Sequence, residues 1–251
     1  ANANKLVLII VPFAIAIAET SLPMLSNAHA NHNWESIKKQ IKNIYRLFYV
    51  AMLLSAFGLY AVALPMYTVF YGTSDPDLLA GVQLLKVSAI VAIFFGYFTI
   101  LSFIIQGLGH ARTAMKALIY GILLKMVFQV PMIYMLQATG AMLSTLIGFV
   151  FSSCYLLNEI KKNYQVSILD TSADLFKTIV IGISVLISAS IVVKLLELVF
   201  PLTRFAQIIV LLVAVFFGGI VGILLLIRFN VADELLRRFI PARFFKGVQR
   251  K

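Results

Sequence analysis

Two ionisable side chains lie inside apolar stretches of this 251-residue chain, and they are the residues best suited to chemistry. Lys125 stands within GILLKMVFQVPMIY, with Gln129 one helical turn further along the same face. Glu19 stands among small residues in FAIAIAETSLPMLS. A Lys or Asp inside a membrane costs roughly 2.5–3.5 kcal/mol on insertion scales, so such groups usually face a partner or a cavity. An ammonium in a cavity would attract an anionic headgroup such as a diphosphate, while a carboxylate would tune that charge or carry a coupling proton.

The same two residues admit a second interpretation. Lys125 and Glu19 would then form a buried ion pair, or each would extend separately toward the membrane surface, with no role in binding. Residue spacing alone does not choose between these interpretations. Lys125, Glu19 and Gln129 are therefore candidate residues of a substrate cavity.

Motifs of common enzymes are absent from the sequence. It contains no GxxxxGK[ST], GxSxG or HExxH, the patterns of ATP hydrolysis, serine hydrolysis and zinc proteolysis. His29 and His32 are three residues apart, but no cysteine or further histidine is near them in the sequence, so we expect no metal site. The single cysteine, Cys154, lies in an apolar stretch and forms no internal disulfide. We therefore expect neither an enzyme nor a bound cofactor.

Apolar stretches long enough to cross a bilayer fill most of the chain. A bilayer core of about 30 Å needs about 20 apolar residues as helix. Apolar residues make up 61% of the chain and charged residues 12%, whereas about 25% of a soluble domain is charged. These observations predict an all-α, polytopic membrane helix bundle with seven transmembrane helices. The predicted spans are residues 5–26, 47–70, 84–107, 116–137, 139–158, 176–200 and 205–228.

Basic residues gather in alternate connecting segments and so predict an orientation. Sixteen of the 21 Lys and Arg residues fall in segments 27–46, 107–116, 158–177 and 228–251. By the positive-inside bias these four segments are cytoplasmic, and so is the C-terminus. Anionic lipid headgroups account for the net charge of +11, and nothing resembles a nucleic-acid-binding surface. We expect a multi-pass protein of a bacterial cytoplasmic membrane, with membrane lipids as partners and no nucleic acid.

Two basic segments are predicted to contact lipid headgroups. Residues 34–45 place apolar side chains at helical spacing opposite a row of lysines, which predicts an amphipathic helix lying on the cytoplasmic surface. The tail, residues 229–251, is basic with interleaved phenylalanines, and we interpret it as a headgroup-bound anchor. The predicted membrane-surface bases are Lys38, Lys39, Lys42, Arg237 and Arg238.

Two short patterns predict how helices pack. The connection QATGA, residues 137–141, is so short that the fourth and fifth spans should form an antiparallel hairpin. Gly218 and Gly222 lie four residues apart on one helix face, a spacing typical of a packing seam either within one chain or between two chains.

Three segments resemble the multidrug/oligosaccharidyl-lipid/polysaccharide (MOP) exporter superfamily. GILLKMVFQVPMIYMLQATGAMLSTLIG is similar to its eleventh and twelfth spans, where a Gly, a mid-span Lys, an Asn one turn later and G-x-x-G-A-x-x-x-T recur. The Ala-rich first span ends in LPMLS, residues 22–26, like the eighth span of that family, and IIQGLGHAR, residues 104–112, is similar to the exit from its tenth. Gln129 stands where Asn is usual, and only the second Gly of the glycine pair is kept. The matching residues are Gly121, Lys125, Gly140, Ala141 and Thr145.

The resemblance covers about residues 1–228 and is closest to the branch of stage V sporulation protein B and MurJ-like lipid-linked precursor flippases. It implies a MOP/MATE-like fold of which this chain is the C-terminal part, spans eight to fourteen. Residues 1–158 would form the C-terminal lobe, 159–228 two additional helices and 229–251 a basic cytoplasmic tail. Since the chain begins without Met on the non-cytoplasmic side, we expect a fragment or a processed chain. The missing N-terminal lobe of the same protein would supply the other wall of the cavity.

The activity that the resemblance implies is transport, with no bond made or broken. The chain would help move an undecaprenyl-diphosphate-linked saccharide, foremost the peptidoglycan precursor lipid II, across the membrane by alternating access. Membrane potential or a coupling ion, H⁺ or Na⁺, would give direction. Exporters of other lipid-linked polysaccharide units and drug/cation antiporters of the same superfamily are alternatives. A seven-helix receptor or a membrane scaffold is a rival of another class, although residues 205–228 lack the Lys of a rhodopsin-type last span.

Overall fold

The computed structural model describes residues 10–72, 78–201, 203–229 and 231, apart from the side chains of Ile168 and Leu169. All regular structure in this part of the chain is helical, which confirms the all-α fold class. The elements are α2 (Val11–Ala30), α3 (Trp34–Phe48), the π-helical turn η1 (Tyr49–Leu53), α4 (Leu54–Ala61), α5 (Ala63–Tyr71), α6 (Leu78–Gly107), α7 (Ala111–Tyr164), the 3₁₀ turn η2 (Ile168–Thr171), α8 (Ser172–Val199) and α9 (Arg204–Phe229).

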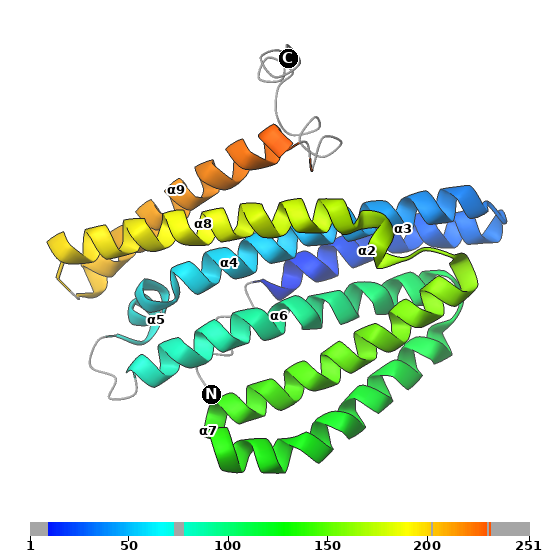
Figure 1. Ribbon diagram of the computed structural model, residues 1–251, viewed down its shortest axis with the longest axis horizontal. Coiled ribbons are helices and arrows are strands. Elements are labelled where there is room, and N and C mark those ends of the chain that lie inside the picture. Colours follow the sequence, from blue (N-terminus) through cyan, green and yellow to red (C-terminus); the bar gives the residue numbers. More distant parts are fainter. Residues whose placement is uncertain (1–9, 73–77, 202, 230, 232–251) are drawn as a thin grey trace.

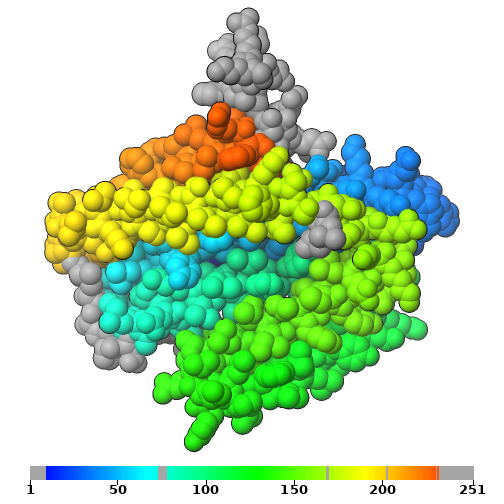
Figure 2. Space-filling view, viewed as in Figure 1, coloured from blue at the N-terminus to red at the C-terminus, as the bar shows by residue number. Residues whose placement is uncertain are grey.

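The helix α6 lies at the centre of the bundle. In Figure 1, α8 and α9 run along one edge and the long α7 forms the opposite edge, with α4 and α6 between them. The space-filling view also shows α8 and α9 on the far side of the molecule from α7 (Figure 2). Leu85, Ile100 and Leu101 of α6 are fully buried, because α6 packs against both α2 and α7. The helix α8 packs mainly against α9 and α4.

The helix that begins at Trp34 continues through a π-helical turn to Ala61, and it differs from the surface helix expected from the sequence. The apolar face expected to rest on headgroups is inside the bundle, where Ile37, Ile41 and Tyr45 are fully buried and α2 is the main neighbour of α3. The prediction of a separate helix lying on the membrane surface is therefore wrong. An amphipathic pattern shows that one face has an apolar partner, and here that partner is protein instead of lipid.

Two of the superfamily-like motifs meet where α2 and α6 end. Ser26, the last residue of LPMLS, donates a hydrogen bond to the carbonyl oxygen of Gly107 at 3.1 Å. A Cβ added to Gly107 would lie 3.3 Å from the Cβ of Leu25, so the glycine lets the two helices approach closely. Gly109 then adopts a φ of +82°, which suits a residue without a side chain and turns the chain into α7.

The long helix α7 is a hairpin of two legs. Gln137, at φ 51° and ψ −128°, breaks the helical path, and we call residues 111–136 the first leg and 138–164 the second leg. The short QATGA connection predicted this hairpin, and the structure confirms it. The first leg carries many exposed apolar side chains, of which Tyr134 is 92% exposed. That surface is suited to lipid or to further protein and not to water.

The backbones of the two legs touch. A Cβ added to Gly148 on the second leg would lie 2.7 Å from the carbonyl oxygen of Gly121 on the first leg. One turn away, the hydroxyl of Ser152 donates a hydrogen bond to the carbonyl oxygen of Ala117 at 2.8 Å. Small residues at these positions allow close backbone contact, as is usual between membrane helices.

The glycine seam of α9 faces α8 of the same chain. A Cβ on Gly218 would lie 3.4 Å from the Cβ of Ala189, and one on Gly222 would lie 3.3 Å from a methyl group of Val185. Of the two uses that the sequence left open for this seam, the structure shows packing within one chain.

Three polar contacts join α3 and η1 to the start of α8, and we call them the α3–α8 clamp. The residues of α3 and η1 lie on successive turns of one helix face and meet η2 and the first turn of α8. The two ion pairs are partly exposed, and such pairs contribute only about 0–1 kcal/mol each. The clamp contacts are Arg46 Nε to Asp174 Oδ2 at 2.6 Å, Lys42 Nζ to Asp170 Oδ2 at 3.4 Å, and Tyr49 Oη to Thr171 Oγ1 at 3.1 Å.

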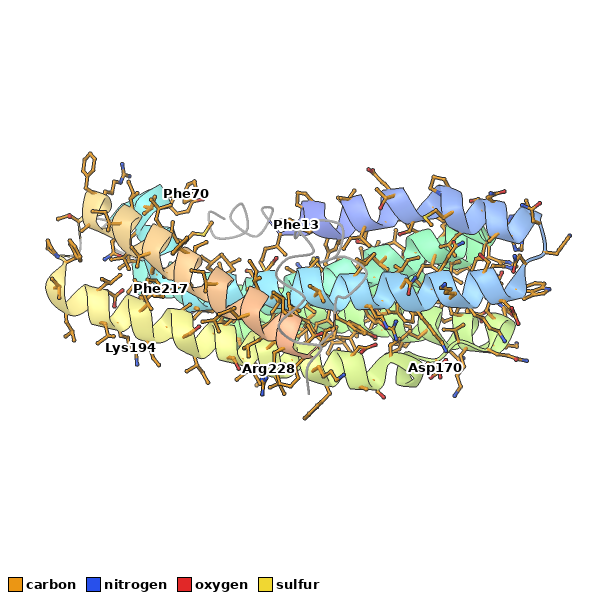
Figure 3. The ribbon with its side chains drawn as sticks, turned by 90° about the horizontal axis from the view of Figure 1, so that it is seen from above. Phe13, Phe70, Asp170, Lys194, Phe217 and Arg228 are labelled. Carbon is orange, nitrogen blue, oxygen red and sulfur yellow. The ribbon has the colours of Figure 1, made fainter. Side chains whose placement is uncertain are left out.

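Within the described residues, five helices are long and apolar enough to cross a membrane. They are the helix 34–61, α6, α7, α8 and α9. Counting the second leg of α7 and the helix α2 as further crossings gives seven, and that count stays a prediction. Large apolar side chains project outward along these helices, and Phe13, Phe70 and Phe217 are each more than half exposed; Figure 3 labels them on α2, α5 and α9.

Candidate functional site

A groove opens between α6 and the two legs of α7, with the start of α2 at one side. Its volume is about 370 Å³. A second hollow of about 240 Å³ shares part of this lining and extends between Phe98 and the first leg. We call the pair the Lys125 groove. The residues that line the larger hollow are Val11, Ser88, Val91, Ala92, Phe95, Lys125, Gln129, Ala141, Met142, Thr145 and Phe149.

Lys125 lines both hollows and so lies where they meet. It is half-buried on the first leg, and its stem runs beside Gly148, where an added Cβ would lie 3.3 Å from the Lys125 Cβ. Gln129 lies one turn further along the same leg and joins the lining of the larger hollow. The structure therefore brings together two of the three candidate cavity residues.

Among the described residues, Lys125 is the one formally charged residue in the lining of either hollow. The three lining hydroxyls donate to backbone carbonyl oxygens: Ser88 Oγ to that of Leu84 at 2.7 Å, Thr145 Oγ1 to that of Ala141 at 2.9 Å, and Ser152 Oγ to that of Ala117 as described above. This leaves the ammonium of Lys125 and the amide of Gln129 as the N–H donors that the lining side chains offer. A groove with one cation and no carboxylate attracts an anion.

Aromatic side chains form the opposing wall. Phe95 of α6 meets Phe149 of the second leg edge to face, with ring centroids 5.1 Å apart. Phe98 also packs against Phe149, with ring centroids 5.8 Å apart. These rings keep water away from part of the groove, and a charge interacts more strongly in such a low-dielectric setting than in water.

The superfamily-like motif of α7 accounts for much of this geometry. Lys125, Ala141 and Thr145 line the groove, and Gly121 provides the backbone contact that sets the spacing of the two legs. Gly140 lies against the carbonyl oxygen of Met132 just past the turn of the hairpin. The motif residues of the two legs are therefore brought together by the hairpin of α7, and they line one wall of the Lys125 groove.

Glu19 is not part of the groove lining. It is exposed on α2, and no ion pair joins it to Lys125 within the described part of the chain. The interpretation of Lys125 and Glu19 as a buried ion pair therefore finds no support. A role for Glu19 in transport stays a prediction.

The predicted membrane-surface bases have different surroundings. Lys39 is exposed and Lys38 is half-buried, whereas Lys42 pairs with Asp170 in the α3–α8 clamp. Arg237 and Arg238 lie outside the described residues. Contact of these bases with lipid headgroups stays a prediction.

Several lining residues were not predicted from the sequence. Phe95, Phe149 and Ser88 stand in largely apolar stretches of α6 and α7, where no periodic signal distinguishes them from neighbouring residues. Their role comes from the packing of α6 against α7, which the sequence does not specify directly.

Comparisons with known proteins agree with this architecture. The family model described as lipid II flippase MurJ matches residues 2–203. The lipid II flippase MurJ of Bacillus subtilis (strain 168) is 28% identical over 248 residues, which cover 97% of this chain and 45% of that protein. An uncharacterized membrane protein of Methanocaldococcus jannaschii is 30% identical over 78 residues, which cover 31% of this chain and 18% of that protein.

A solved structure has the same fold. Lipid II flippase MurJ in an inward closed conformation superposes with a TM-score of 0.67 at 18% sequence identity, over 95% of this chain and 47% of that one. The chain therefore spans about half the length of the relatives that it matches along its whole length.

Proposed function

Because this chain belongs to the lipid II flippase MurJ family, we propose that it forms the C-terminal half of a flippase for undecaprenyl-diphosphate-linked saccharides. The proposed cargo is lipid II, carried from the cytoplasmic to the outer leaflet of a bacterial cytoplasmic membrane. One observation carries the proposal: of the described residues that line a groove built from α2, α6 and both legs of α7, Lys125 alone carries a formal charge. Family membership also decides against the seven-helix receptor.

The groove suits the diphosphate part of such a cargo. The ammonium of Lys125 would pair with a phosphate oxygen, and the amide of Gln129 would donate to a neighbouring oxygen one helical turn away. Phe95 and Phe149 would limit water around that contact and strengthen it. The long apolar chain of the lipid would remain among apolar surfaces of the bundle or in the bilayer.

The other wall of the cavity would come from an N-terminal lobe of the same protein. Two observations support this: the chain spans 45% of its Bacillus subtilis relative, and the first leg of α7 leaves many large apolar side chains exposed. Rocking of the two lobes about a site near the membrane midplane would give alternating access. The membrane potential, worth about 2.3 kcal/mol per charge per 100 mV, or a coupled H⁺ or Na⁺, would give direction.

Complementation by the full-length protein tests the proposed function. In cells depleted of their own lipid II flippase, we expect expression of the full-length protein to restore growth and the amount of lipid II accessible at the outer surface. An extracellular enzyme that cleaves lipid II measures that amount. A membrane-inserted protein that restores neither contradicts the lipid II proposal, and export of another lipid-linked saccharide in its place supports that alternative.

We also propose that the end of α7 and the C-terminus face the cytoplasm, as the distribution of bases indicates. In a Cys154→Ala background, a cysteine at Thr203 should react with an impermeant maleimide on intact cells, and one at Asn163 should not. Both positions are exposed in the structure. The side of the membrane on which each residue lies, and not burial of its side chain, therefore decides whether it reacts. Permeabilised cells provide the control in which both cysteines react. The reverse pattern on intact cells contradicts the orientation.

A further inference from the structure

Two tyrosine hydroxyls lie in the core of the bundle without a hydrogen bond of good geometry. Tyr45 of α3 is fully buried and Tyr97 of α6 is 9% exposed, and the Oη atom of neither has a hydrogen-bond partner among the described residues. A serine or threonine hydroxyl can turn back to a carbonyl oxygen of its own helix. A tyrosine hydroxyl is too far from its own backbone to do so. Since buried polar groups nearly always have a partner, something is expected to bind these two.

Tyr49 brings a third hydroxyl to the same place. The ring centroids of Tyr45 and Tyr49 are 6.4 Å apart, and those of Tyr45 and Tyr97 are 6.2 Å apart. Electrostatic interactions join each pair of the three hydroxyls, and that of Tyr97 lies close to that of Tyr49. The three hydroxyls therefore converge, although they extend from α3, η1 and α6.

The backbone is also irregular at this point. Tyr49 is the first residue of the π-helical turn η1. A π-turn replaces the usual hydrogen bond to the fourth preceding residue with one to the fifth, and such turns are frequent at functional sites. The turn is kept in the core, where Tyr49 and Met52 are buried. It is a second sign, independent of the hydroxyls, that this place is specialised.

The surroundings of the three hydroxyls favour a neutral ligand. A phenol hydroxyl has one hydrogen to donate and lone pairs to accept with, and it carries no charge near neutral pH. Asp174 interacts with Tyr49, but its carboxylate is already paired with Arg46 at 2.6 Å in the α3–α8 clamp. A small neutral molecule that both donates and accepts hydrogen bonds fits this set of groups.

We propose that the hydroxyls of Tyr45, Tyr49 and Tyr97 bind one internal water molecule between α3, η1 and α6. About three polar partners are usual for a buried water. Because Tyr49 also shares a hydrogen bond with Thr171, the water extends the α3–α8 clamp to α6. The site is separate from the Lys125 groove, whose lining includes none of the three tyrosines.

X-ray radiolytic labelling of the full-length protein in detergent tests the proposal. Intense X-rays convert bound water into hydroxyl radicals, which oxidise the nearest side chains even where bulk solvent has no access. Tyr45 and Tyr97 should be oxidised at least about tenfold faster than Tyr67, because a water is bound beside them. Tyr67 is the control: it is 4% exposed, and its ring lies so close to Gly81 that an added Cβ would touch it.

Two substitutions test which hydroxyls hold the water. Tyr45→Phe should slow the oxidation of Tyr97, and Tyr97→Phe should slow that of Tyr45, since each removes one partner of the water. Both variants should also have a lower Tm than the wild type. Tyr120→Phe removes the hydroxyl of an exposed tyrosine on the first leg and is the matched control, which should change neither the labelling nor the Tm.

Three results would overturn the proposal. Oxidation of Tyr45 and Tyr97 as slow as that of Tyr67 would mean that no water lies beside them, whatever the Tm values are. Fast oxidation that neither substitution slows would place the water elsewhere. A higher Tm in both Tyr45→Phe and Tyr97→Phe would mean that the two hydroxyls are unpaired in the folded protein, because removal of an unpaired buried hydroxyl stabilises.

Discussion

Lys125→Ala in the full-length protein should lower the rate of lipid II transport by roughly 10- to 150-fold, the equivalent of about 1.5–3 kcal/mol for a charge-assisted hydrogen bond. The expected cause is loss of the single cation that the described residues contribute to the lining of the groove. Folding should change little, because no ion pair of Lys125 within the described residues is broken. Outer-surface lipid II in depleted cells measures transport, and Tm in detergent measures folding.

Two further variants separate charge from position. Lys125→Arg keeps the charge and should retain part of the activity, although the planar guanidinium cannot place it in the same way. Lys116→Ala removes an exposed lysine from the same leg and should leave transport unchanged. A fully active Lys125→Ala protein would refute the role of this lysine in the groove. A large fall in Tm that Glu19→Gln reverses would instead revive the ion-pair interpretation.

Gly148→Ala should destabilise the hairpin of α7 by about 1–3 kcal/mol, the usual cost of overpacking. The added methyl group would lie 2.7 Å from the carbonyl oxygen of Gly121 and 3.3 Å from the Cβ of Lys125. Because the first of these neighbours is backbone, the two legs must separate to accept the new atom. We therefore expect a lower Tm together with reduced transport, since Lys125 moves with the first leg.

Gly219→Ala is the matched control for that substitution. Gly219 lies within α9, and a Cβ added there meets nothing within 4 Å. Since alanine favours a helix over glycine by about 1 kcal/mol, this variant should be as stable as the wild type or more so. If Gly148→Ala and Gly219→Ala have the same Tm, the close contact of the two legs does not limit stability.

The part of the fold that could be predicted from the sequence is the part encoded locally. The hairpin of α7 followed from a connection too short for any other arrangement. The common face of Lys125 and Gln129 followed from their spacing of one helical turn. Each inference needed only neighbouring residues and the geometry of a helix.

What could not be predicted depends on which surfaces meet. The row of isoleucines in α3 indicated an apolar partner, but only the packed bundle shows that α2 provides it. Glu19 lies within an apolar stretch, yet its position along the helix did not reveal that it is exposed and outside the groove lining. The aromatic wall of Phe95 and Phe149 joins residues 54 positions apart, both in continuous apolar sequence.

The α3–α8 clamp has a consequence for how the protein is made. Arg46 and Asp174 are separated by 128 positions in the chain, so the clamp cannot close until the ribosome has produced most of this segment. At about 5–20 residues per second, that interval lasts roughly 6–26 s. During that interval, the faces of α3 and α4 that later contact α8 have no α8 partner. They lie inside the membrane or in contact with the insertion machinery. Cells that synthesise this protein would therefore hold an unfinished bundle for many seconds at a time, and a membrane chaperone that covers α3 and α4 would find its substrate in that interval.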